Sequence, residues 1–313
     1  MKTLVCGEAL IDLIKQPDSS WIAHNGGGPL NTAKALVRLG EAADFLGRIA
    51  ADPFGLQLRT DIQNSGIGMA KIVDATEPTS LAVVEISDQG SASYSFYLEN
   101  TSNFCWQESE LPSSGLAEYD LLHIGTLALI IQPGSQVLFN WVAKHCNSSV
   151  VMMDLNIRPS VIADAKQYLD LISPWLSFAD ILKVSDEDLA FLYPASDWSE
   201  IAKTYFANTN VKLIAITLGS AGAVLLTPDH EVRLAAPKVA VVDTVGAGDT
   251  FSAALASKLN AFGKLDKSQL GKFTQQELIE SLKYAIFAAA LNCTRAGADA
   301  PTKSEVMEAI SVG

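Results

Sequence analysis

The chain has 313 residues, of which 49% are hydrophobic and 18% are charged, and its formal net charge at pH 7 is −13. This length suffices for one large α/β domain with a small attached element, and the high apolar content is typical of a protein that buries a large parallel sheet. The acidic character argues against nucleic acid and against an anionic membrane surface as partners.

The N-terminal run LVCGEALIDLI contains no cleavage-site pattern, and the polar residues Glu8 and Asp12 interrupt it. The longest apolar stretch, at residues 127–131 and their flanks, is too short to span a bilayer. The four cysteines are scattered without CxxC spacing, which predicts reduced thiols and neither a zinc site nor a redox pair. We therefore expect a cytoplasmic protein without a membrane partner.

Strand-like and helix-like segments alternate along the chain. The strand-like runs are LVCGEAL from residue 4, ADFLGRI from 43, DLLHIG from 120, SVVMMDLN from 149, ILKVS from 181, VKLIAITLG from 211, GAVLLT from 222 and VAVV from 239. Helical periodicity is found in NTAKALVRLG from residue 31, FGLQLRTDIQNSG from 54, residues 136–145, residues 163–178, DEDLAFLY from 186, FSAALASKLNAF from 251, and a long final helix at 275–292. The alternation predicts βαβ units with right-handed crossovers, and hence a parallel sheet with helices on both faces.

The pattern changes between residues 72 and 97. Here TSLAVVEIS and SASYSFYLEN alternate polar and apolar residues around Asp88, Gln89 and Gly90. Such alternation about a turn predicts a β-hairpin outside the layered core.

The segment VDTVGAGDTF joins the strand-like run at residues 239–242 to a helical pattern. Gly246 and Gly248 allow a tight turn and the approach of a ligand to bare amides, and the free N–H groups of a first helical turn attract anions. A phosphate suits such a site. Asp249 at this position is either a helix N-cap or a base that accepts a proton from an incoming hydroxyl group.

An upstream segment, HNGGGPLNTA, also places glycines before a helical pattern. Asn31 offers a donor and acceptors beside three glycines, which suits a polyhydroxylated ligand, although Asn31 can instead cap the helix. Two such segments in one chain predict two ligands.

Three segments, GGGPLNTAKALVRLG, FLGRIAADPFG and DTVGAGDTF, resemble the signatures of the ribokinase-like (PfkB) family of carbohydrate kinases. The resemblance extends from GEALIDLI to RAGADAP and implies a ribokinase-like three-layer α/β sandwich with a mainly parallel sheet and a small β-sheet lid. The core would comprise residues 1–12, 25–70 and 104–313, and the lid residues 13–24 and 71–103. The lid pairs two subunits in several members, so the resemblance also implies a homodimer through the lid.

The resemblance implies a sugar pocket. Asp12 matches a family carboxylate that accepts hydrogen bonds from sugar hydroxyls, at what we expect to be the carboxyl end of the first parallel strand. Gly27, Gly28 and Asn31 match the same pocket. Asp249 would contact the acceptor hydroxyl of the sugar.

Other segments, YSFYLENTSNFCW, HIGTLALIIQP and DLNIRP, resemble the fructokinase branch of the family. Asn156 and Arg158 would then face the substrate and the nucleotide phosphates, where an arginine can bind an oxyanion through two parallel donors. The branch usually has Ala after the ENT element, whereas this chain has Ser102 and Asn103. Asn103 would meet the sugar, and this departure leaves the substrate open.

The TLGSAG turn after LIAI matches the family's turn near the ATP phosphates and ribose, although a tight turn alone also explains its glycines. No GxxxxGKS/T motif and no strand-linked GxGxxG motif is found, which disfavours a P-loop kinase and a Rossmann dehydrogenase. The residues expected to contact ATP are Lys183, Thr217, Gly219, Gly222, Gly246, Gly248 and Asn292.

Two carboxylates are candidates for metal ions. Asp188 ends the segment that aligns with the family's NxxE element, which is tied to magnesium and phosphate effects, and its short side chain is compatible with coordination through water. Asp243 resembles a ligand of the family's monovalent cation. The implied cofactors are therefore ATP and Mg²⁺, with K⁺ as a further candidate.

The implied reaction is transfer of the ATP γ-phosphoryl group to a primary sugar hydroxyl. Asp249 would be the base, the amides of Gly246, Ala247 and Gly248 would stabilise negative charge on the phosphoryl oxygens, and Arg158 would add positive charge. A fructokinase is favoured. A 2-keto-3-deoxygluconate kinase or another PfkB sugar or nucleoside kinase is the alternative within the family, and a catalytically silent sugar-binding regulator is the alternative outside enzymes.

Overall fold

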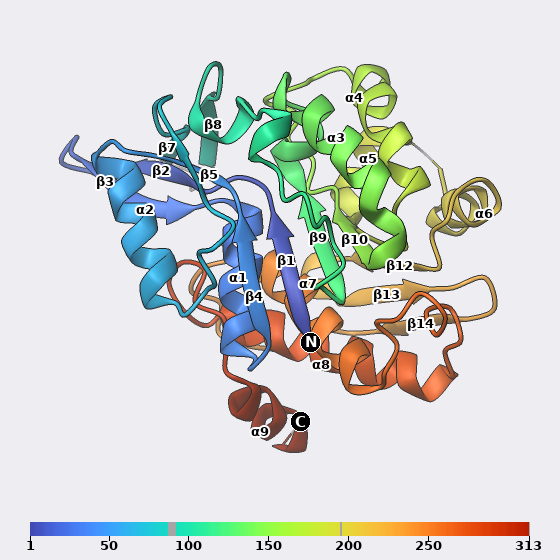
Figure 1. Cartoon of the computed structure of the whole chain (residues 1–313). Helices are drawn as coiled ribbons and strands as arrows, with labels where there is room; N and C mark the ends of the chain where they lie inside the picture. Colours follow the sequence, from blue (N-terminus) through green and yellow to red (C-terminus); the bar gives the residue numbers. More distant parts are fainter. Residues whose placement is uncertain (87–91, 195, 313) are drawn as a thin grey trace.

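An eight-stranded sheet forms the centre of the computed structural model, which describes residues 1–86, 92–194 and 196–312 (Figure 1). Its strands, in spatial order, are β14 (Glu231–Leu234), β13 (Ala223–Leu226), β12 (Leu213–Thr217), β11 (Ile181–Ser185), β10 (Val150–Asp154), β9 (Leu121–Gly125), β1 (Lys2–Cys6) and β4 (Ala42–Leu46). The pairs β12·β13 and β13·β14 are antiparallel, and all other neighbours in this sheet are parallel. The mainly parallel α/β fold expected from the sequence is confirmed.

Helices cover both faces of the sheet and form two separate hydrophobic cores. The first core contains residues from α3 (Gly134–His145), α4 (Ala165–Ile172), α5 (Asp186–Leu192) and α6 (Trp198–Asn208). The second core contains residues from α1 (Gly28–Arg38), α2 (Pro53–Asn64), α7 (Ala247–Ala261), α8 (Gln275–Asn292) and α9 (Lys303–Val312). Successive residues of a strand point to opposite faces, so Leu122 and Leu121 of β9 lie in different cores. This explains why the central strands are apolar on both faces.

A second, four-stranded sheet lies at one side of the sandwich (Figure 1). Its spatial order is β3 (Trp21–Gly26), β2 (Leu10–Lys15), β7 (Leu81–Ile86) and β8 (Ala92–Tyr97). β7 and β8 pair antiparallel, in agreement with the expected hairpin, whose turn around Asp88, Gln89 and Gly90 lies outside the described residues. A short pair, β5 (Arg48–Ala50) and β6 (Val73–Ala75), links this region to the core.

The small sheet includes residues that we had assigned to the core. β2 begins at Leu10 and β3 ends at Gly26, whereas the expected lid segment covered residues 13–24. Asp12 is consequently not at the carboxyl end of a core strand: it lies within β2, opposite His24 of β3 and Ala82 of β7. The first core strand already ends at Cys6.

Three expectations about secondary structure are wrong. Residues 239–242 form no strand, and Val241 and Val242 are 62% and 64% exposed, because this apolar run lies along a groove instead of pairing with the sheet. The helix expected at 163–178 ends at Ile172 and continues as a 3₁₀ turn that begins before Pro174, which cannot donate the helical hydrogen bond. The helix at 275–292 has the expected bounds but is not the final helix, because α9 follows it.

The carboxyl ends of the parallel strands meet at one edge of the large sheet. β9 ends just before Thr126, β10 at Asp154, β11 at Ser185 and β12 at Thr217. The first turn of α7 lies beside this edge, since Ser252 donates a hydrogen bond to Asp154. Such an edge is where ligands bind in open α/β sheets.

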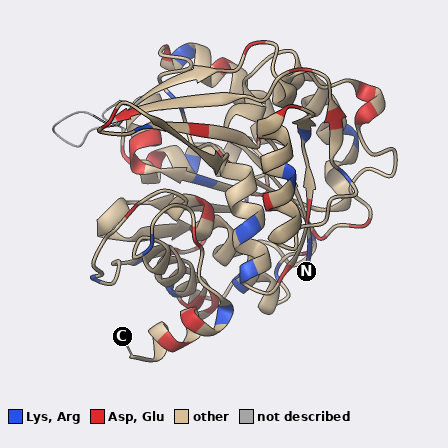
Figure 2. Cartoon of the chain, turned by 90° about the vertical axis from the view of Figure 1, so that its left-hand side faces the viewer, with Lys and Arg blue, Asp and Glu red and all other residues tan. Residues whose placement is uncertain are grey.

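In the view of Figure 2, the positions of Lys and Arg and those of Asp and Glu are spread over many segments of the chain. Among the described residues, no helix is both long enough and apolar enough to cross a membrane.

Candidate active site

The loop before α7 forms a turn that exposes backbone amides. Gly246 has φ 75°, and a Cβ atom added to it would lie 2.5 Å from the Cβ of Ala298, so only glycine fits here. The helix starts at Ala247, and no side chain caps its first turn. The Ala247 amide donates to the Thr244 carbonyl at 3.2 Å, whereas the amides of Gly248 and Asp249 have no backbone acceptor among the described residues. These free amides lie at the positive end of the helix dipole, which is the arrangement that binds phosphate.

Two side chains, the partly buried Asp243 and the fully buried Asn292, hold this loop in place. Asp243 accepts hydrogen bonds from the amides of Val245 at 3.0 Å and Gly297 at 2.8 Å. Asn292 is fully buried, donates to the Val245 carbonyl at 2.8 Å and accepts from the Thr250 hydroxyl at 3.2 Å. We expected Asn292 to contact the nucleotide, but its side chain instead supports the loop from behind.

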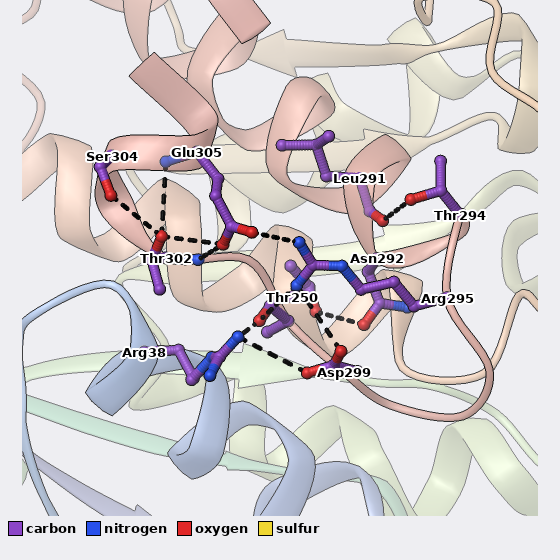
Figure 3. A network of polar contacts seen from close by, with 11 residues as sticks. Arg38, Thr250, Leu291, Asn292, Thr294, Arg295, Asp299, Thr302, Ser304 and Glu305 are labelled. Atoms are coloured by element: carbon purple, nitrogen blue, oxygen red, sulfur yellow. Dashed lines mark hydrogen bonds and ion pairs between the residues drawn. The ribbon is translucent and has the colours of Figure 1, made fainter. Parts of the chain in front are cut away.

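Ion pairs clamp the segment that packs against Gly246 (Figure 3). Arg295 pairs with Glu305 of α9 and with Asp299 at 3.6 Å, and Arg38 of α1 pairs with Asp299 at 3.7 Å. The Arg38 side chain also donates to the carbonyl of Ala300 at 3.0 Å. The first and last helices of the core therefore fix the backbone that shapes the anion-binding turn.

Asp249 is 7% exposed and lies in the first turn of α7 without capping it, so the N-cap interpretation is wrong. Its Oδ2 accepts a hydrogen bond of 2.9 Å from the side-chain amide of Asn31. Burial and the nearby Asp154 carboxylate raise the pKa of Asp249 to about 6, against the lowering effects of Asn31, Lys183 and Arg158. The carboxyl group is thus mainly ionised at neutral pH, and its pKa is close enough to neutral pH for it to accept and release a proton.

Three polar side chains converge on Gly28. A Cβ added to Gly28 would lie 3.1 Å from Asn156 Nδ2, 3.2 Å from Asp249 Oδ1 and 3.2 Å from Thr126 Oγ1. Thr126 and Asn156 both have positive φ, 57° and 38°, a strained conformation typical of functional sites. Gly27 is also required, since its Cβ would lie 2.5 Å from the Glu8 carbonyl. These groups form a polar cluster beside Asp249, which we call the polar pocket.

Arg158 and Asp12 extend this pocket toward the small sheet. The Arg158 side chain donates to Asn156 Oδ1 at 2.7 Å, and its charge acts on both Asp12 and Asp249. Burial raises the pKa of Asp12 to about 6, while the His24 and Arg158 side chains oppose the shift. The structure therefore brings together the predicted residues Asp12, Gly27, Gly28, Asn31, Asn156, Arg158 and Asp249.

Sequence reasoning missed two residues here, Glu8 and Thr126. Glu8 is 1% exposed, its Oε2 has no partner among the described residues, and burial raises its pKa to about 8, against hydrogen bonding from backbone amides and the charge of Arg158. Its signal was a carboxylate inside an otherwise apolar run. Thr126 directly follows a buried strand, which marks it as a residue at the ligand-binding edge.

Asn103 is 2% exposed and donates to the Arg48 carbonyl at 3.1 Å. The adjacent Ser102 offers its carbonyl to the Arg48 guanidinium at 3.0 Å. Both residues therefore attach the chain leaving the small sheet to β5, and a contact of Asn103 with the sugar stays a prediction.

A groove of about 900 Å³ lies beside the start of α7, where Ala247 and Gly248 line it. This volume is in the range of nucleotide-sized ligands. The residues that line it include the predicted Thr217, Gly219, Gly222 and Gly248, together with residues 185–187, Lys238, Val239, Val241 and Cys293. The misassigned apolar run at 239–242 thus forms part of a ligand groove. This groove and the polar pocket meet at the start of α7.

Lys183 and Asp188 do not face this groove openly. Lys183 is 3% exposed and forms an ion pair with Asp154 at 3.1 Å. Asp188 accepts hydrogen bonds of 2.9 Å from the amides of both Ile157 and Ser185, so its carboxylate is engaged by backbone and caps α5. This disfavours Asp188 as a direct metal ligand. The described residues contain no group of three or more His, Cys, Asp or Glu side chains arranged to hold a metal ion.

Comparison with known proteins agrees with this geometry. The model of the pfkB family carbohydrate kinases matches residues 2–305. The chain belongs to this family. A fructokinase of Rhizobium leguminosarum bv. trifolii is 34% identical over 279 residues, which are 88% of this chain and 85% of that protein.

Two solved structures share the fold over nearly the whole chain. The fructokinase of Xylella fastidiosa with bound ATP superposes with a TM-score of 0.90 at 26% identity, covering 99% of this chain and 98% of that one. The fructokinase of Vibrio cholerae O395 with fructose, ADP and calcium gives a TM-score of 0.83 at 26% identity, covering 98% of both chains. The expected fold and the assignment as a carbohydrate kinase are confirmed.

We predict that Gly28→Ala lowers kcat/KM for the sugar on the order of a hundredfold, because the new methyl group would crowd Asn156, Asp249 and Thr126 and displace the reacting hydroxyl. Steady-state kinetics measure this effect, and calorimetric titration of the same variant with ATP is the control, since the groove is unchanged. Parental sugar kinetics in the folded variant would contradict the pocket.

We predict that Asp243→Ala raises the KM for ATP more than the KM for the sugar, because it releases the amides of Val245 and Gly297 that fix the anion-binding turn. Asp243→Asn retains one acceptor oxygen and should give a smaller effect. Equal changes in both KM values would show that the loop does not act selectively on the nucleotide.

Proposed function

We propose that this carbohydrate kinase is a fructokinase, which transfers the γ-phosphoryl group of ATP to a primary hydroxyl of fructose. The observation that carries the proposal is the position of Asp249. Its carboxylate is buried, lies beside Gly28 and accepts a hydrogen bond from Asn31, while the preceding residue Gly248 lines the nucleotide-sized groove. A base at this place can take the proton of a hydroxyl that lies beside a phosphate bound at α7.

The proposed chemistry is a direct transfer. The sugar oxygen forms a bond to the γ-phosphorus, the bond from this phosphorus to the β–γ bridging oxygen breaks, and ADP leaves with the electron pair. Asp249 takes the hydroxyl proton, and the first-turn amides of α7 stabilise the charge on the phosphoryl oxygens. Because burial raises the pKa of Asp249 to about 6, activity should fall as the pH drops through this value and the base becomes protonated.

Arg158 and Asp12 are the two further side chains to which we assign a role in the polar pocket. Arg158 carries its charge between Asp12 and Asp249, where it would balance the incoming phosphoryl group. Asp12 offers acceptor oxygens to sugar hydroxyls from the small sheet. Closure of this sheet over the sugar would exclude water, which competes with the sugar as acceptor.

We infer that Mg²⁺ enters with ATP. Mg²⁺ is usually held by one or two carboxylates together with substrate phosphates, and Asp186 and Glu187 line the groove whereas Asp188 is engaged by backbone. When bound, the ion would neutralise phosphate charge. A monovalent cation at Asp243, such as K⁺, remains a prediction.

The small sheet offers a surface for a homodimer. Trp21, Ile22, Tyr94 and Tyr97 on β3 and β8 are exposed large hydrophobic residues, and such groups are often covered by a partner. Their location supports the expected pairing of two subunits through this sheet. A cytoplasmic location is likewise retained as a prediction.

We predict that Asp249→Asn lowers kcat by about a hundredfold to ten-thousandfold, because it removes the base while nearly preserving shape. A coupled assay of ADP release with fructose measures the effect, and calorimetry should show that both ligands still bind. Asp229→Asn, an exposed carboxylate in the turn between β13 and β14, is the matched control and should keep parental activity. Near-parental turnover of Asp249→Asn would remove the proposed base.

We predict that fructose is preferred over ribose, adenosine and 2-keto-3-deoxygluconate, with glucose a poor substrate, because a pocket of hydroxyl-binding groups penalises ligands that leave buried polar groups unpaired. Asp12→Ala should lower kcat/KM for fructose and leave ATP binding unchanged. A coupled assay across this panel measures both effects. Activity concentrated on the sugar acid or the nucleoside would favour the alternative family activities, and no activity on any sugar would favour the silent regulator.

A further inference from the structure

A buried ion pair lies directly behind the proposed transfer site. Lys183 and Asp154 are opposite each other on the neighbouring strands β11 and β10, with 3.1 Å between Nζ and Oδ1. Their side chains are only 4% and 3% exposed. The second oxygen of Asp154 accepts a hydrogen bond of 3.1 Å from Ser252, which lies one turn after Asp249 on α7. The pair is thus connected to the helix that carries the proposed base.

The ammonium group lies against the start of α7. A Cβ added to Gly248 would be 3.0 Å from Lys183 Nζ, and Gly248 is the residue before Asp249. A cation at this end of a helix opposes the helix dipole, and burial of an ion pair is costly even when the pair is well made. A contribution to folding stability is therefore a poor reason for the Lys183 ammonium group at this position. An electrostatic effect on the adjacent site is a better reason.

Charged groups act on Asp249 from several elements. They are Asp154 on β10, Arg158 after β10 and Lys183 on β11, and the neutral Asn31 of α1 adds its hydrogen bond. Glu8 in the β1–β2 connection is a further titratable group of this region, but burial raises its pKa to about 8, so it is mainly uncharged at neutral pH. Asp154 favours the protonated form of Asp249, while Lys183 favours the ionised form. Lys183 is itself held in its charged form, because Asp154, Asp188 and Asp249 outweigh the burial that would lower its pKa. The two members of the pair therefore act on Asp249 in opposite directions.

We propose that the buried Asp154–Lys183 pair, which is bonded to Ser252 of α7 and lies against Gly248, tunes Asp249 electrostatically as a base, with Asp154 strengthening the base and Lys183 weakening it. Both are positioning residues, since neither faces the pocket or the groove openly. The proposal deepens the proposed function and depends on Asp249 being the base. It assigns Lys183 a role behind the anion-binding turn in place of the direct nucleotide contact that we expected from the sequence.

The test is the pH dependence of kcat with fructose and ATP saturating, since the acid side of this profile reports the base in the ternary complex. Asp154→Asn removes a repelling carboxylate and should shift the acid side to lower pH on the order of one unit. Lys183→Met leaves the repelling carboxylate of Asp154 in place. In this variant the acid side of the kcat profile should therefore lie at a pH equal to or higher than in the parent enzyme. The double variant buries no uncompensated charge at this position, and the acid side of its profile should lie at a pH between those of the two single variants.

Asp180→Asn is the matched control. Asp180 precedes β11 at the opposite end of the same strand, is buried, and pairs with Lys267. Its replacement should lower the midpoint of thermal unfolding without moving the acid side of the profile. Circular dichroism and gel filtration establish that each variant is folded, and if one single variant does not fold, the other is compared with the double variant.

The outcomes separate two failures. If Asp249→Asn remains active, the proposed base is wrong. If Asp249→Asn is inactive but Asp154→Asn leaves the acid side unmoved, or Lys183→Met shifts it to lower pH, the pair is structural and this inference is overturned while the proposed function stands. The inference is supported if the pH at which kcat falls on the acid side is lower in Asp154→Asn, and higher in Lys183→Met, than in the double variant.

Discussion

The hydrogen bond between Asn31 and Asp249 joins two halves of the site that are far apart in the sequence. It connects α1, whose first residue Gly28 forms the polar pocket, with α7, whose first turn forms the anion-binding turn. Because both side chains are at most 8% exposed, the bond forms only when the two helices pack on the same face of the sheet. The geometry of the site therefore depends on the packing of the second hydrophobic core.

Much of the fold and part of the site could be predicted from the sequence. Continuous apolar runs followed by helical periodicity indicate buried parallel strands, and glycines at Gly28 and Gly246 indicate places where a side chain would obstruct a ligand or a neighbouring segment. These signals are local. They identified Asp249 and Asn31 as candidate site residues. They did not predict the hydrogen bond between the two side chains, because tertiary packing brings these residues together.

The errors share a physical cause: sequence patterns do not show what a side chain faces. The valines at residues 239–242 have strand propensity, yet they line a groove. Asn292 ends a helix near the site, but its amide is used within the protein. In these cases the residue type was read correctly, but the group that the side chain contacts was not the one expected from the sequence.

An acidic chain can bind a polyanion because the charge near the site is local and directional. The amides of α7 provide positive potential without a net charge, so the −13 of the whole chain does not prevent phosphate binding. Two cations nearby are each attached to an acceptor: the buried Lys183 to Asp154 and the partly buried Arg158 to Asn156. Cations held in this way cannot move to meet the phosphates, and groups fixed before the reaction need no reorganisation when charge develops in the transition state.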